Sequence, residues 1–223
     1  MALDMTILAP RPKGAAETIA ALLTADGGKS HPYIASNIFA RGREAARDLA
    51  DAVHFLATLH GRHPGVIEFA RDRAGDGAAH AWLEEAAAAF SEERSYLTKI
   101  VVAAGPLPST PGQAESEAAV SGQRHALEML AKSDRTGCAV GAAMALVLDW
   151  RAARTVIDAA AQRFGVTLTP PALPSQRQTL ALAEAAETPG IERAMVFGAQ
   201  QLLVQHRGLW SLLEARSEAR LGI

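Results

Sequence analysis

The sequence predicts an all-α protein: a bundle of about five long helices with short accessory helices, of up-and-down type with a buried central helix. Glycine and proline divide the 223 residues into long segments, and apolar residues within these segments recur with the period of a helix. No stretch alternates apolar and polar residues strictly enough to predict a strand. Long helices joined by short loops pack as mostly antiparallel neighbours, which gives the bundle.

Helix boundaries follow from glycine, proline and capping residues. The expected helices, in chain order, cover about residues 13–25, 34–60, 66–73, 79–104, 111–132, 138–164, 176–187 and 190–220. Gly105 ends the fourth and is followed by proline, the usual order at a helix end. Thr110 and Gln113 have the spacing of a capping box for the fifth. Thr188 and Pro189 begin the last helix in a similar way.

The helix expected over residues 138–164 is the candidate for the bundle centre. Its first half, from Cys138 to Leu148, is apolar on every side, which is typical of a helix surrounded by others. Residues 166–174 carry three prolines and form an irregular connection, the best candidate for a domain boundary. We nevertheless expect one domain over residues 1–223, because the final helix alone offers too little surface to fold apart.

Charge and hydropathy exclude several classes of protein. A net charge of −2 and a pI near 6.4 do not fit a nucleic-acid-binding protein, which usually has a basic face. Arg41, Arg43 and Arg47 lie among acidic residues, so we interpret them as part of a solvated helix face. No apolar stretch approaches the roughly 18 residues of a membrane span, and the first residues lack the features of a secretory signal. We therefore expect a cytoplasmic protein that binds neither nucleic acid nor membrane.

Common catalytic motifs are missing from the sequence. There is no glycine-rich phosphate loop, no Gly-x-Ser-x-Gly nucleophile elbow and no Cys-x-x-Cys pair for zinc. The single cysteine, Cys138, lies in an apolar run without a neighbouring base, so we expect it to behave as a small buried hydrophobic residue.

Four polar residues interrupt the apolar faces of the expected helices: Glu93, Gln123, Asp149 and His206. If Glu93 is buried it must be paired, protonated or metal-bound; otherwise it lies at the edge of its stripe and reaches solvent. His206 is either a neutral, hydrogen-bonded histidine or a metal or cofactor ligand. A buried Gln123 indicates a local polar network. If they converge, Glu93, Asp149 and His206 are the candidate metal ligands, and Gln123 completes a candidate cofactor site.

Two further groups have suggestive spacing but a simpler interpretation. Asp51 and His54 have the acid-x-x-His spacing that ferritin-like di-iron bundles use twice, yet the pair falls on the side away from its helix's apolar stripe. We interpret it as a surface hydrogen-bonded pair. His60, His63 and His80 surround a break between two helices, and we interpret their proximity as a coincidence of the loop.

Two functions fit these observations. The first is a non-enzymatic bundle that binds a small ligand or forms a homo-oligomer and contains a buried polar network. Phe197 and Trp210, beside the apolar stripe of the last helix, are candidates for a homodimer seam. In length and helix number the architecture resembles the ferritin-like and haem-oxygenase-like classes. That resemblance implies the second function, a metal- or cofactor-dependent enzyme with a mid-bundle Glu/Asp/His site, although no particular cofactor is indicated.

Overall fold

The computed structural model describes residues 14–36, 38–75 and 77–222, and all regular structure in these residues is helical, which confirms the predicted fold class. The elements in chain order are α1 (Ala15–Asp26), the 3₁₀ helix η1 (Gly28–Ser30), α2 (Pro32–Ala35), α3 (Ile38–Arg41), α4 (Ala45–His60), α5 (Val66–Arg73), α6 (Ala78–Ala104), α7 (Gln113–Ala131), α8 (Cys138–Phe164), α9 (Gln176–Glu184) and α10 (Pro189–Leu221).

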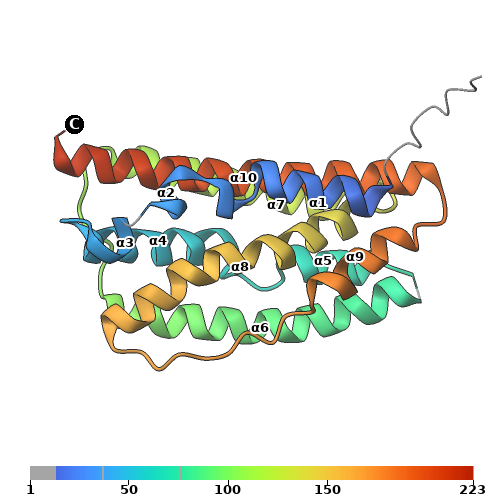
Figure 1. The fold of residues 1–223 in the computed structure, drawn as a ribbon, viewed down its shortest axis with the longest axis horizontal. Helices are drawn as coiled ribbons and strands as arrows, with labels where there is room; N and C mark the ends of the chain where they lie inside the picture. Colours follow the sequence, from blue (N-terminus) through green and yellow to red (C-terminus); the bar gives the residue numbers. More distant parts are fainter. Residues whose placement is uncertain (1–13, 37, 76, 223) are drawn as a thin grey trace, which may run out of the picture.

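The central helix of the bundle is α8. Helices α6, α8 and α10 run in one direction, and α4 and α7 run in the opposite direction (Figure 1). α8 packs against α1, α4, α5, α6, α7, α9 and α10, most extensively against α10. All residues from Gly141 to Trp150 are buried. The prediction of a buried helix beginning at Cys138 is therefore confirmed, and its apolar run needs no polar face because helices surround it.

Two glycines allow α8 and α10 to approach closely. A Cβ at Gly141 would overlap the backbone carbonyl of Met195, and a Cβ at Gly198 would overlap that of Cys138. Each glycine thus receives the backbone of the opposite helix where a side chain would hold the two axes apart. This close crossing brings His206, further along α10, within reach of α8.

The single helix predicted over residues 34–60 is wrong, because the chain is broken there into α2, α3 and α4. Ser36, at the end of α2, is extended with φ −74° and ψ 158°. In a continuous helix, Tyr33 and Phe39 would point about 120° apart. The break lets both side chains be buried in edge-to-face contact, with ring centroids 4.8 Å apart. No proline marks this break, so the sequence pattern did not reveal it.

The capping box predicted at Thr110 is also wrong. Helix α7 begins at Gln113, and its N-cap is Gly112, whose positive φ of 72° suits glycine. Thr110 is instead buried, and its hydroxyl accepts a hydrogen bond from Arg220 at 2.9 Å. The cap predicted for the last helix is confirmed, because the Thr188 hydroxyl accepts from the Ile191 N–H at 3.2 Å.

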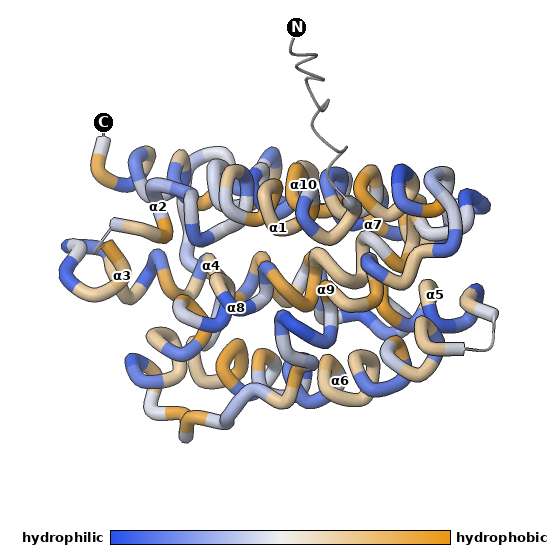
Figure 2. Tube along the Cα trace, turned by 45° about the vertical axis from the view of Figure 1, so that its right-hand side comes forward, coloured by the Kyte–Doolittle hydropathy of each residue, from blue (hydrophilic) through white to orange (hydrophobic). Residues whose placement is uncertain are grey.

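Hydrophilic and hydrophobic positions are mixed along the outer helices (Figure 2), as expected where each helix buries one face. Trp210 is buried in the core, 1% exposed, so it does not contribute to a homodimer seam as the sequence suggested. Phe197 is exposed on the same helix. Across the described part of the chain, none of the helices has both the length and the apolar character needed to cross a membrane.

Candidate functional site

Three buried polar residues from three helices form a continuous chain of hydrogen bonds, which we name the histidine chain: Asp149 of α8, His206 of α10 and His60 of α4. Asp149 Oδ2 is 2.7 Å from His206 Nδ1, and His206 Nε2 is 2.8 Å from His60 Nε2. The other oxygen of Asp149 accepts from the Gly28 N–H at 2.7 Å. The chain therefore ties α4, α8 and α10 to the turn that follows α1.

The hydrogen-bond partners assign the protons of the histidine chain. An ionised carboxylate only accepts, so His206 must donate from Nδ1 to Asp149. At the contact between the two histidines, a neutral His206 accepts from His60 Nε2, whereas a protonated His206 donates to His60 Nε2. Asp149 thus fixes the proton on Nδ1 of His206 in both arrangements.

Aromatic side chains enclose His60. Its ring is perpendicular to those of Trp150 and Phe90, with centroid separations of 5.6 and 6.3 Å. This burial lowers the pKa of His60 well below its ordinary value, and the neighbouring His206 and Arg94 lower it further. His60 is therefore neutral in the folded protein near neutral pH.

Glu93 belongs to a second network on the other side of Trp150. Its carboxylate accepts from Trp150 Nε1 at 2.8 Å and from Arg154 Nη1 at 2.9 Å. Arg154 also forms an ion pair with Asp158 at 2.9 Å. Consecutive helix residues point about 100° apart, so Asp149 reaches α10 while Trp150 reaches α6. The two acids near mid-bundle are thereby directed to different partners.

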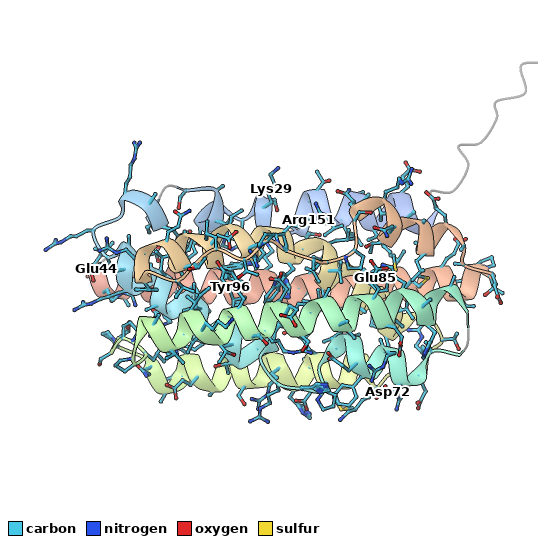
Figure 3. The ribbon with its side chains drawn as sticks, turned by 90° about the horizontal axis from the view of Figure 1, so that it is seen from below. Lys29, Glu44, Asp72, Glu85, Tyr96 and Arg151 are labelled. Carbon is cyan, nitrogen blue, oxygen red and sulfur yellow. The ribbon has the colours of Figure 1, made fainter. Side chains whose placement is uncertain are left out.

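The second network also includes the buried Tyr96, whose hydroxyl donates to the more exposed Asp158 at 3.1 Å. Burial, followed by the hydrogen bond to Asp158, raises the pKa of Tyr96 to about 12. The phenol therefore stays protonated and keeps its role as donor. Tyr96 lies midway along the molecule (Figure 3).

The structure brings together part of the set predicted from the sequence. Asp149 and His206 are in direct contact, whereas Glu93 is hydrogen-bonded to Trp150 and Arg154. Gln123 is half-buried, and the space beside Gly208 of α10 is filled by its amide nitrogen. Among the residues that the structure describes, no three histidine, cysteine or acidic side chains are grouped so that they could hold a metal ion.

Asp51 and His54 are not the surface pair that their spacing suggested. Asp51 is 1% exposed, and both of its oxygens accept from Arg216, at 3.0 and 3.1 Å. His54 is hydrogen-bonded to a different partner, with its Nε2 2.8 Å from the Gly105 carbonyl oxygen. The helical wheel misplaced Asp51 because the C-terminal part of α10 covers the side of α4 that was taken as exposed.

Asp51 is part of a cluster that we name the arginine–aspartate clamp: Asp48 and Asp51 of α4 with Arg216 and Arg220 of α10. Arg220 bonds Asp51 at 2.5 Å and also bonds Asp48. The acids are three residues apart and the arginines four apart, so each pair occupies one face of its helix. Two acids on one face of a helix and two arginines on one face of another were the signal in the sequence that could have revealed the clamp.

His60 was a second omission. The sequence placed it beside a glycine at the end of a helix, which looked like a loop. In the structure it is the last residue of α4 and 5% exposed. Its importance depends on α10 passing beside the end of α4, and no local pattern carries that information.

A cavity of about 570 Å³ lies at one end of the bundle. It is open to solvent on one side and is lined by the end of α5 and of α9 and by the start of α6, α8 and α10. Most of the lining side chains are small and apolar, among them Ala70, Ala74, Ala139, Val140, Leu182, Ala186, Ile191 and Met195. We name it the apolar cavity. Asp72, near the end of α5, lies at this end of the molecule (Figure 3).

Four charged residues line the apolar cavity, Arg73 and Arg135 with Asp134 and Glu187, so its formal charge is zero. Arg73 donates to the Lys132 carbonyl at 2.6 Å and to Asp134 at 3.1 Å, which holds the turn between α7 and α8 against α5. Arg135 lies over the ring of Phe197, 5.4 Å from its centroid. Within the described residues no ion pair joins Arg135 to an acid, so its guanidinium retains free donors beside the cavity.

Comparison with known families gives one match. The sequence model described as a family of unknown function, DUF6975, matches residues 23–221. The comparison with curated proteins found no match, and neither did the comparison with solved structures. The matched range includes the histidine chain, the clamp and the lining of the apolar cavity.

Proposed function

The chain belongs to this family of unknown function, DUF6975, and we propose that it is a non-enzymatic helical bundle that binds a small amphipathic molecule in the apolar cavity. The observation that carries the proposal is the cavity itself. Its volume of about 570 Å³ falls within the range of 300–1,000 Å³ typical of small-ligand sites, and such sites combine apolar walls with a few polar groups.

Among the charged groups of the lining, the unpaired Arg135 favours a ligand with an anionic end. Arg135 has free donors at the rim, and Ala139 and Val140 of the first turn of α8 line the wall. A carboxylate there would meet the positive end of the helix dipole as well as the guanidinium. The alanine-rich wall would take the hydrocarbon part of the ligand.

Binding can be tested with pairs of probes that share a hydrocarbon skeleton, octanoate against octylamine and benzoate against benzylamine, by isothermal titration calorimetry. The carboxylates are expected to bind and the amines to bind at least about tenfold more weakly, since one charge-assisted hydrogen bond is worth roughly that factor. Ala186→Leu, which places a larger side chain in the cavity, should weaken binding by at least about tenfold. Ala118→Leu, on the exposed side of α7, is the matched control. Failure of all four probes to bind, or equal loss in both variants, would refute the proposal.

Self-association forms part of the same proposal. Phe197 and Val204 are both exposed, seven residues apart on α10, and this spacing places them on one face of the helix. Val204→Lys should then shift sedimentation velocity profiles from dimer to monomer. A monomeric wild-type protein would remove self-association and leave ligand binding unaffected.

A metal-dependent enzyme is the second candidate, and one observation favours it. A carboxylate that holds one nitrogen of a histidine, as Asp149 holds His206, is how proteins commonly orient a metal-binding imidazole. A metal would have to replace the proton between His206 and His60. Elemental analysis of protein purified without chelator should then show about one metal ion per chain, lost in His206→Ala. This candidate would be excluded if the protein contains no metal and its melting temperature does not change when iron, manganese or zinc is added.

A further inference from the structure

A second hollow, of about 420 Å³, lies at the opposite end of the bundle from the apolar cavity. It is lined by residues 39–47, where α3 turns into α4, and by Arg163 in the last turn of α8. Glu44 marks this end of the molecule, and Asp72 marks the other (Figure 3). Because the 27 residues of α8 connect the two ends, the hollows are separated by roughly the 40 Å length of that helix.

Arginine side chains dominate the second hollow. Arg41, Arg43, Arg47 and Arg163 line it, and we name it the arginine pocket. Glu44 is the one acid among its lining residues, so the formal charge there is +3, in a chain whose net charge is −2. All four arginines are exposed, in agreement with the solvated face predicted from the sequence, and Glu44 offsets only one of their four charges.

Most of this positive charge has no partner within the protein. Glu44 forms an ion pair with Arg47 at 3.1 Å. Among the described residues, no ion pair involves Arg41, Arg43 or Arg163. Three guanidinium groups around one hollow repel one another, and an anion between them removes that repulsion. The start of α4 adds partial positive charge at the same place.

We propose that the arginine pocket binds the phosphate groups of a small, soluble phosphorylated molecule. A guanidinium presents paired N–H donors that match two phosphate oxygens at once, which a lysine ammonium does not do. A charge of +3 suits a ligand with two or more negative charges better than a monocarboxylate. Glu44 competes with the ligand for Arg47 and so weakens binding.

Isothermal titration with inorganic pyrophosphate at low ionic strength tests the proposal. Wild-type protein should bind one pyrophosphate per chain, and Arg43→Gln and Arg163→Gln should each weaken the affinity by about tenfold. Glu44→Gln should strengthen it, because the competing carboxylate is removed. Arg177→Gln, an exposed arginine on α9, makes the same change in net charge outside the pocket and should leave the affinity within about twofold.

Three results would overturn the proposal. They are no pyrophosphate binding by the wild-type protein, equal weakening by Arg177→Gln and Arg43→Gln, and Arg43-dependent sedimentation with vesicles containing anionic lipid in the absence of pyrophosphate binding. The last result would identify a membrane headgroup as the ligand in place of a soluble molecule. Ala186→Leu, which places a larger side chain in the apolar cavity, should not change pyrophosphate affinity, so failure here is distinguishable from failure of the proposed function.

Discussion

The histidine chain and the arginine–aspartate clamp both join α4 to α10, but they use different chemistry. The clamp joins two carboxylates to two guanidinium groups through ion pairs. The histidine chain contains one carboxylate and two imidazoles, with no permanently charged cation. The same pair of helices is therefore held at one point by ion pairs and at another by a hydrogen-bonded chain that contains His60, whose pKa burial lowers.

The contrast predicts that the clamp is the more costly of the two to break. Arg216→Met removes both hydrogen bonds from Arg216 to Asp51 and leaves a buried carboxylate with Arg220 alone. We expect the free energy of unfolding to fall by about 3–5 kcal/mol, the usual effect of breaking a buried ion pair, measured by urea denaturation. The control, Arg151→Met on the exposed side of α8, should stay within about 0.5 kcal/mol. A loss below about 1 kcal/mol in Arg216→Met would contradict the comparison.

The histidine chain should tolerate Asp149→Asn better than Asp149→Ala. Asp149→Ala leaves His206 Nδ1 and the Gly28 N–H without an acceptor, so unfolding should become easier by about 1–3 kcal/mol. Asp149→Asn should cost less, because its amide can accept from Gly28 and donate to the opposite tautomer of His206. Equal losses in the two variants, by urea denaturation at pH 7.5, would show that the tautomers cannot reverse.

Acidification should weaken the histidine chain and leave the clamp intact. Burial lowers the pKa of His60 in the folded state, so below the unfolded value near 6.5 the unfolded chain takes up a proton that the folded protein does not. Stability from this residue is therefore complete above about pH 6.5 and falls as the pH decreases, by up to about 1.4 kcal/mol per pH unit. Burial also lowers the pKa of His31, which adds to the slope in the same direction.

Urea denaturation at several values between pH 7.5 and 5.5 measures this slope. His60→Gln should flatten it by about 1 kcal/mol over the range, whereas Arg216→Met should lower stability equally at every pH. Burial alone would raise the pKa of Glu68, but hydrogen bonds from Arg94 and Gly65 outweigh it and lower the pKa. The stability that ionised Glu68 contributes is therefore lost only below pH 5.5, outside the measured range. An unchanged slope in His60→Gln would show that the histidine chain is not the pH-sensitive region.

The smallest effect is expected at Glu93. In Glu93→Gln the amide oxygen still accepts from Trp150, and Arg154 keeps Asp158 and the Thr169 carbonyl as partners. We expect a loss of about 1 kcal/mol in the free energy of unfolding, the value of one hydrogen bond. Its exposed neighbour provides the control variant Glu92→Gln, which should have no measurable effect. A decrease of more than about 3 kcal/mol in the free energy of unfolding would contradict this prediction, because Glu93 would then stabilise the fold as much as the clamp does.

The sequence by itself determined the fold class, most helix boundaries and the central position of the helix from Cys138 to Phe164. These depend on local causes: the helical period of apolar residues, glycine and proline at helix ends, and the Thr188 cap. It also singled out Asp149 and His206, because a polar residue on an apolar face must find a partner.

The tertiary structure decided which partner each polar residue finds. The position of α10 relative to α4 decides two of these partners. It places Arg216 against Asp51, which would otherwise face solvent, and it places His206 against His60 at the end of α4. That placement follows from the close approach of α8 and α10 at Gly141 and Gly198, which is a contact between segments far apart in the chain. A helical wheel orders residues around one axis and carries no information about the neighbouring axis, so these partners could not be read from the sequence.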